Sequence, residues 1–99
     1  MFKICGYRQV SGEFTPTDRQ NASPIQYDSY KFAFLTDEDK RYTGYATAKD
    51  GMKEITIPVK RLKEISGFDD PKDLINKSFD LLYTISYGKP VLKQMLLLK

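Results

Sequence analysis

The segment from Pro58 to Gly67, PVKRLKEISG, decides how the rest of the chain is organised. Val59, Leu62 and Ile65 recur every three residues with charged residues between them, which is the pattern of a helix with one buried face. Proline is favoured in the first turn of a helix and glycine just past its end, so Pro58 and Gly67 mark the two boundaries. Stretches that alternate in polarity dominate the rest of the 99 residues, so the sequence predicts one helix within a β-structure.

Three strand-like stretches precede this helix. Phe2–Val10 and Ile25–Thr36 are rich in β-branched and aromatic residues and alternate in polarity. A third strand is expected in two parts, Tyr42–Ala48 and Lys53–Ile57. The two parts are separated at Lys49–Gly51, where an Asp-Gly pair is a strong turn signal.

The alternation in the first two strands also predicts which side chains share a face. One face of the first strand is expected to hold Phe2, Ile4, Gly6, Arg8 and Val10. We interpret Cys5 as a small buried hydrophobe, the usual environment of a free cysteine. In the second strand, Asp28, Tyr30, Phe32 and Phe34 share the core face. Tyr27, Ser29, Lys31 and Ala33 then face solvent.

A second short helical turn is expected after the helix. Asp70 is a plausible N-cap, and Pro71 stands at the first helical position. Leu74 and Ile75 are expected to form the buried side of this turn.

The chain closes with a predicted hairpin. Its strands are Phe79–Tyr87 and Val91–Leu98, and its turn is Gly88–Pro90. The last strand is apolar on both faces, with Val91, Met95 and Leu97 on one and Leu92, Leu96 and Leu98 on the other. Such a strand must be covered on both faces, here by the helix or by a second subunit.

The expected order of elements is therefore β-β-β-α-β-β. A helix between the third and fourth of five short antiparallel strands is the arrangement of the OB-fold, a partly open β-barrel. The chain length suits one such domain over residues 1–99. An SH3-like barrel is the second choice, because it lacks a helix of this length at this position.

Composition excludes several classes of chemistry. The chain has no histidine and one cysteine, which excludes a Cys/His zinc site and a catalytic Ser-His-Asp or Cys-His arrangement. No convergent carboxylate pair or glycine-rich phosphate motif is visible, so we expect neither an enzyme nor a cofactor. The N-terminal segment lacks the apolar run of a signal peptide, and no stretch approaches the ~20 apolar residues of a membrane span. A cytoplasmic location without membrane contact is expected.

In layout the chain resembles the small single-stranded DNA-binding proteins of phages and plasmids, the filamentous-phage type. The features that carry the resemblance are the polar loop Ser11–Pro24, the tyrosine-rich strand Ile25–Thr36, the loop Asp37–Arg41 and the closing hairpin Phe79–Leu98. The resemblance implies exposed tyrosines that stack on bases, basic residues that meet phosphates, and a homodimer. It also implies a role in the replication or transfer of phage, plasmid or mobile-element DNA.

The residues themselves suggest where such binding takes place. A solvent-facing tyrosine beside a lysine provides a stacking surface together with phosphate neutralisation. Tyr27 with Lys31 on the second strand, and Tyr45 with Lys49 on the expected third strand, fit this description. If the two strands are neighbours, these four residues form one aromatic and basic groove.

Further basic residues in or near loops are expected to surround that groove: Arg8, Arg19, Lys40, Arg41 and Lys89. Arg19 is the strongest single candidate, because the long loop around it is otherwise poor in cations. The net charge of +3 permits a polyanionic partner without requiring one. DNA and RNA remain alternatives at this point.

A protein-interaction or assembly adaptor is the alternative function. Exposed aromatic residues are enriched at protein interfaces, and the apolar strand Val91–Leu98 offers a surface for a partner. The two functions are compatible, since one surface can form a homodimer while another binds nucleic acid.

Overall fold

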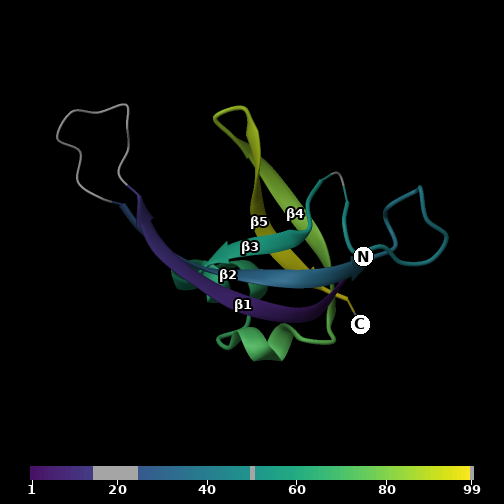
Figure 1. Ribbon diagram of the computed structural model, residues 1–99, viewed down its shortest axis with the longest axis horizontal. Helices are drawn as coiled ribbons and strands as arrows, with labels where there is room; N and C mark the ends of the chain where they lie inside the picture. Colours follow the sequence, from purple (N-terminus) through teal and green to yellow (C-terminus); the bar gives the residue numbers. More distant parts are fainter. Residues whose placement is uncertain (15–24, 50, 99) are drawn as a thin grey trace.

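The computed structural model describes residues 1–14, 25–49 and 51–98, and it is mainly β (Figure 1). Five antiparallel strands form one sheet, and a short helix lies between the third and fourth strands. The strands are β1 (Phe2–Phe14), β2 (Ile25–Thr36), β3 (Glu54–Pro58), β4 (Ser78–Ser86) and β5 (Lys89–Leu97). The helical segments are η1 (Val59–Arg61), α1 (Leu62–Ser66) and η2 (Pro71–Leu74).

Strand β1 is the centre of the sheet, whose order is β3-β2-β1-β4-β5. It pairs with β2 along its whole length, from Phe2 opposite Thr36 to Phe14 opposite Ile25. Its pairing with β4 is confined to Phe2 and Lys3 at its first residues. Among the described strands no ladder joins β3 to β5, so the sheet curves without closing into a barrel.

The core lies on the concave side of this sheet. Phe32, Phe34 and Phe79 are its largest fully buried side chains. Leu62 and Ile65 of α1 pack into the same cluster, and α1 lies against β5. The two opposite faces predicted for β2 are confirmed at its centre, where Phe32 is buried and Ala33 is exposed.

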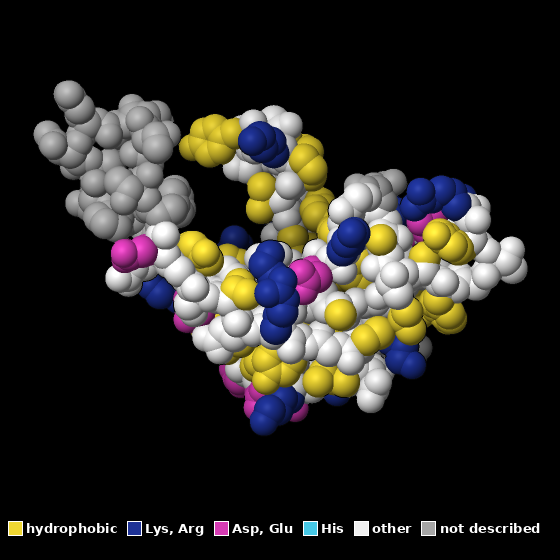
Figure 2. Space-filling model, viewed as in Figure 1, with side chains coloured by type: hydrophobic (Ala, Val, Ile, Leu, Met, Phe, Trp, Pro, Cys, Tyr) yellow, Lys and Arg dark blue, Asp and Glu magenta, His cyan; other side chains and the backbone are white. Residues whose placement is uncertain are grey.

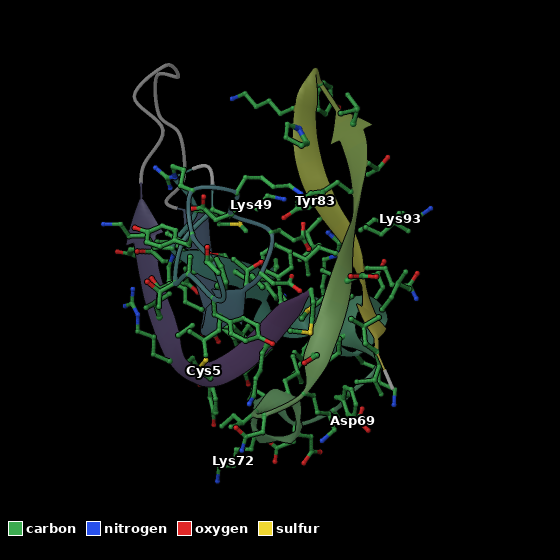
Figure 3. The ribbon with its side chains drawn as sticks, turned by 90° about the vertical axis from the view of Figure 1, so that its right-hand side faces the viewer. Cys5, Lys49, Asp69, Lys72, Tyr83 and Lys93 are labelled. Carbon is green, nitrogen blue, oxygen red and sulfur yellow. The ribbon has the colours of Figure 1, made fainter. Side chains whose placement is uncertain are left out.

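A β-bulge at Cys5 corrects the face prediction for the first strand. The register shifts between Ile4 and Gly6, so Cys5 has no partner on β2. Because side chains alternate with period two, one extra residue moves all later side chains to the other face. Tyr7 therefore packs beside Phe32 on the core side, and Arg8 lies on the outer face. Cys5 itself is exposed rather than buried, at the bend of β1 (Figure 3).

The expected strand Tyr42–Ala48 is wrong. This segment consists of turns, and its only ladder contact among the described residues is the single bridge between Thr36 and Ala46. Asp39 accepts hydrogen bonds from the backbone and side chain of Arg41, which closes a turn that a strand does not tolerate. Gly44 has a φ of +94°, a left-handed conformation that also ends extended structure.

The C-terminal boundary of the helix is confirmed, but the expected start is wrong, because Pro58 is the last residue of β3 and the α-helix begins at Leu62 after the 3-10 turn η1. Gly67 follows α1 in the left-handed conformation, with a φ of 81°, and its N–H donates to the carbonyl of Lys63. The Asp70 side chain accepts a hydrogen bond from the N–H of Lys72, as expected of an N-cap. These capping motifs involve only residues that are close in the sequence, so they can be predicted without knowledge of the fold.

The hairpin turn is shorter than predicted. Tyr87 and Gly88 form it, with φ values of 50° and 75° as a type I′ turn requires, so Lys89 and Pro90 belong to β5. A register shift leaves Lys93 unpaired. The shift corrects the faces of the last strand, because Leu92 joins Met95 and Leu97 on the face toward Tyr83, Leu81 and Phe79. Val91 and Leu96 lie on the opposite face.

No helix in the part of the chain that the structure describes is long and apolar enough to cross a membrane.

The core makes a direct stability prediction. Phe32→Ala should lower the free energy of unfolding by about 3–5 kcal/mol, because it removes a fully buried ring and leaves a cavity. Urea denaturation followed by circular dichroism measures the change. The matched control is Ala33→Ser, an exposed neighbour on the same strand, with an expected change within about 0.5 kcal/mol. Equal stability of the two variants would contradict the placement of Phe32.

Candidate nucleic-acid interface

The outer face of β1, β2 and β3 carries three of the predicted site residues: Arg8, Lys31 and Tyr27. Arg8 on β1 lies opposite Lys31 on β2, and Lys31 lies opposite Thr56 on β3. The bulge at Cys5 produces this row, because without it Arg8 would point toward the core. The strands thus place two cations side by side on a surface away from the hydrophobic core.

Tyr27 lies across β1 on this outer face. It pairs with Gly12, and a Cβ atom added to Gly12 would stand 2.5 Å from the Tyr27 hydroxyl oxygen. No other residue type leaves room for the ring there, so Gly12 is a positioning residue for Tyr27. Tyr27 remains 47% exposed, which leaves aromatic surface available to a ligand.

Both cations of this face have hydrogen-bond partners on β3. Arg8 Nε donates to Glu54 Oε2 at 3.0 Å, and Arg8 Nη2 donates to Glu54 Oε1 at 2.9 Å. This hydrogen bonding lowers the pKa of Glu54 and raises the pKa of Arg8. Lys31 Nζ donates to the hydroxyl of Thr56 at 3.3 Å, a neutral partner. Glu54 therefore pairs directly with Arg8, whereas Lys31 has a neutral hydrogen-bond partner and interacts with Glu54 only electrostatically.

A shallow cleft of about 880 Å³ opens beside Tyr27. Its walls are the outer ends of β1 and β2 and the segment Pro58–Lys60 that leads into the helix. The cleft combines the tyrosine with small and polar residues, and Lys60 adds a further cation at its edge. A planar group that enters it meets the ring of Tyr27.

Tyr45 and Lys49 do not join this face. Both follow the end of β2 at Thr36, which is nine residues and therefore roughly 30 Å from Tyr27. Lys49 Nζ donates to Glu38 Oε1 at 2.8 Å and stands 5.9 Å from the centre of the Phe2 ring. Figure 3 shows Lys49 directed toward Tyr83 of β4 rather than toward the outer face. The single groove expected from four residues is therefore wrong, because the strand meant to carry Tyr45 does not form.

Arg41 and Tyr45 lie together in the connection that follows β2. They line a small cleft of about 220 Å³ with Tyr42, whose ring centre is 6.0 Å from the Arg41 guanidinium. Arg41 Nη2 also pairs with Asp39 Oδ2 at 2.7 Å. The hydrogen bonds from the Arg41 side chain lower the pKa of Asp39 to about 2.

The remaining predicted cations lie elsewhere. Lys40 is exposed in the same connection as Arg41, and Lys89 is exposed at the first residue of β5, on the hairpin. Arg19 lies outside the described residues.

Three residues that shape the candidate site were not predicted from the sequence: Gly12, Tyr42 and Thr56. Gly12 shows its role only once its strand partner is known, and the strand was expected to end before it. Tyr42 was assigned to a strand that does not exist. Thr56 had a weak signal, since its alternation with Ile55 and Ile57 already placed it on the outer side of its strand.

A metal site finds no support in the described part of the chain. This part contains no group of three acidic or cysteine side chains that could hold a metal ion. Comparison with protein-family models, with curated proteins and with solved structures finds no match to this chain.

The ion pair of Asp39 and Arg41 predicts a measurable titration. Because the pKa of Asp39 in the fold is about 2, below its ordinary value of 3.8, the pair stabilises the turn above pH 4 and is lost as the pH falls toward 2. Arg41→Ala should return the pKa toward 3.8. Carboxyl carbon shifts followed by NMR against pH measure both values, with Lys40→Ala as control. An unshifted Asp39 in the wild-type protein would contradict the pair.

Proposed function

We propose that the protein binds single-stranded nucleic acid, preferably DNA and largely without regard to sequence, on the outer face of β1–β3. The observation that carries the proposal is the half-exposed ring of Tyr27, laid across Gly12 on the same face as Lys31 and Arg8. A base stacks on the ring, and the two cations contact phosphates. Stacking on an aromatic ring is worth about 1–3 kcal/mol per base and is tolerant of sequence.

The fold supports this proposal. The order β3-β2-β1-β4-β5 with a helix between β3 and β4 fits an OB-fold whose barrel is open between β3 and β5. OB-folds bind oligonucleotides on the outer sheet that contains the second and third strands, which is the face described above. An origin in phage, plasmid or mobile-element DNA metabolism is part of the same proposal and rests on the likeness in layout.

The ligand is single-stranded because Tyr27 needs an unpaired base. In a duplex both faces of each base are stacked on neighbours, so a ring fixed on the protein surface gains no access to them. Lys31 reaches a phosphate without breaking a salt bridge, since its partner Thr56 is neutral. Arg8 must share its donors with Glu54, so its contribution is the smaller of the two.

The first binding prediction concerns the ring. The protein should bind labelled oligo(dT) of about 30 nucleotides, with duplex DNA failing to compete, and Tyr27→Ala should weaken binding about tenfold. Tyr27→Phe keeps the ring and should bind as the wild type does. Gly12→Ala should also weaken binding, because its Cβ displaces the ring without deleting it. Fluorescence anisotropy measures the affinities.

Salt dependence tests the cations in the same assay. Lys31→Ala should reduce the slope of log affinity against log salt by about 0.7, the value for one phosphate contact on a single strand. Lys72 is the matched control, since it is an exposed lysine on η2, outside the outer face of β1–β3; Figure 3 shows it at the lower end of the molecule. No binding of the wild-type protein at low salt would refute the proposed function.

A second candidate function, self-association through the β4–β5 hairpin, has its own observation. The hairpin projects from the sheet, and its tip is mostly apolar in Figure 2. Ile85 is 71% exposed and Tyr87 is fully exposed, while Tyr83 and Val91 are partly exposed. These side chains leave the tip of the hairpin largely apolar toward water, and exposed apolar patches often mark interaction sites.

The occupant that we propose for this tip is a second copy of the chain. Lys89 is the only charged residue between Leu81 and Leu92, so two tips meet in a symmetric contact with little electrostatic cost. A standard interface needs about 800 Å² from each partner. The exposed side chains of the tip, Tyr83, Ile85 and Tyr87, provide part of this area.

The mass in solution tests this candidate. Light scattering coupled to size exclusion should give twice the monomer mass of 11.4 kDa for the wild-type protein. The double variant Ile85→Thr with Tyr87→Asn should be monomeric, since threonine suits a strand and asparagine tolerates the left-handed turn. Tyr45→Ser, which removes an exposed tyrosine elsewhere, should remain dimeric. A monomeric wild-type protein at hundreds of micromolar would exclude the contact.

A further inference from the structure

A second aromatic and basic surface lies beyond the C-terminal end of β2. It consists of Lys40, Arg41, Tyr42 and Tyr45, and we refer to it as the 40–45 patch. Tyr42 is 59% exposed and Tyr45 is 57% exposed, although tyrosines that only cover a core are usually more buried. The cleft of about 220 Å³ between them is small for a whole ligand molecule but suits one planar group.

The 40–45 patch is held at a defined distance from Tyr27. Ala46 and Thr36 exchange two backbone hydrogen bonds of 2.8 Å, which fixes the residue after Tyr45 to the last residue of β2. Tyr27 and Thr36 are nine residues apart on one strand, a separation of roughly 30 Å. The patch and the outer face of β1–β3 are therefore parts of one rigid surface.

Lys31 and Arg8 lie between the two aromatic surfaces. Lys31 is four residues from Tyr27 and five from Thr36, so it stands near the middle of β2. Figure 2 looks onto this side of the molecule and shows basic side chains over the middle of β1–β3 and again over the connection that follows β2. Along β2 the surface is therefore first aromatic at Tyr27, then basic at Lys31 and Arg8, and finally both aromatic and basic at the 40–45 patch.

We infer that one strand of nucleic acid runs along β2 and contacts both Tyr27 and the 40–45 patch. This inference rests on the proposed function and adds a direction and a length to it. A stacked strand advances about 3.4 Å per nucleotide, so roughly nine nucleotides span the 30 Å, and an extended strand needs fewer. The resulting site lies within the range of about 4–16 nucleotides known for single OB-folds.

Oligonucleotides of different lengths distinguish one continuous binding site from two independent sites. An oligonucleotide of about 4 nucleotides reaches only one aromatic surface, so loss of one surface leaves the other available. One of about 12 nucleotides reaches both at once, so loss of either surface removes part of every complex.

The experiment compares Tyr27→Ala with the double variant Tyr42→Ala and Tyr45→Ala on oligo(dT) of about 4, 8 and 12 nucleotides. On the longest ligand each variant should bind about tenfold more weakly than the wild type. On the shortest each should lose no more than about twofold, the statistical factor for one of two equivalent sites. Anisotropy measures the affinities, and the thermal midpoint confirms that the exposed substitutions leave the fold intact.

The double variant Tyr42→Phe and Tyr45→Phe is the matched control, since it keeps both rings and should bind as the wild type does. Wild-type affinity of the alanine double variant for the longest ligand would overturn the inference. An equal loss on the shortest and longest ligands would overturn it too, because it indicates one local site. Either result leaves the proposed function standing if Tyr27→Ala still weakens binding. A wild-type protein that binds none of the ligands refutes the function itself.

Discussion

The extra residue in the central strand, Cys5, is the constraint on which the outer surface depends. Before the bulge, Phe2 and Ile4 face the core, and after it Tyr7 does so in place of Arg8. The one shift therefore keeps an aromatic ring in the core and moves a guanidinium to the outside. It also bends β1, which pairs with β2 along its whole length and with β4 only at its first residues.

Two long β-ribbons, one of β1 and β2 and one of β4 and β5, project beyond the core. They differ in the side chains that they expose to solvent. On the ribbon of β1 and β2, Asp28 accepts hydrogen bonds from Gln9 and Ser11, so the continuation of the core face is polar. On the ribbon of β4 and β5, the same continuation carries Tyr83 and Ile85 and stays apolar. On this face the first ribbon is therefore polar, whereas the second is apolar.

The sequence revealed the features whose causes are local. Gly67 ends the helix, and Asp70 caps the next turn, because each acts on residues within one turn of itself. The alternation around Phe32 identified the two faces of β2 for the same reason. The bulge at Cys5 and the approach of Tyr27 to Gly12 depend on pairing between distant strands, so no short window of sequence contains them. The prediction that Tyr45 lies on a strand was wrong, because the turn closed by Arg41 and Asp39 outweighs the strand propensity of this segment.

This difference explains why the candidate site was predicted in pieces and not as a whole. Residue types near β2 pointed to stacking and phosphate contacts, and Tyr27 and Lys31 do share a face. Their distance from Tyr45 follows from a turn and a two-bond bridge, Thr36 with Ala46, which convert an expected neighbouring strand into an extension of β2. A groove across two strands would hold a short ligand, whereas an extension along one strand holds a longer one. In the proposed site, the direction of the binding surface, and with it the length of the ligand, therefore follows from the conformation of the connection after β2.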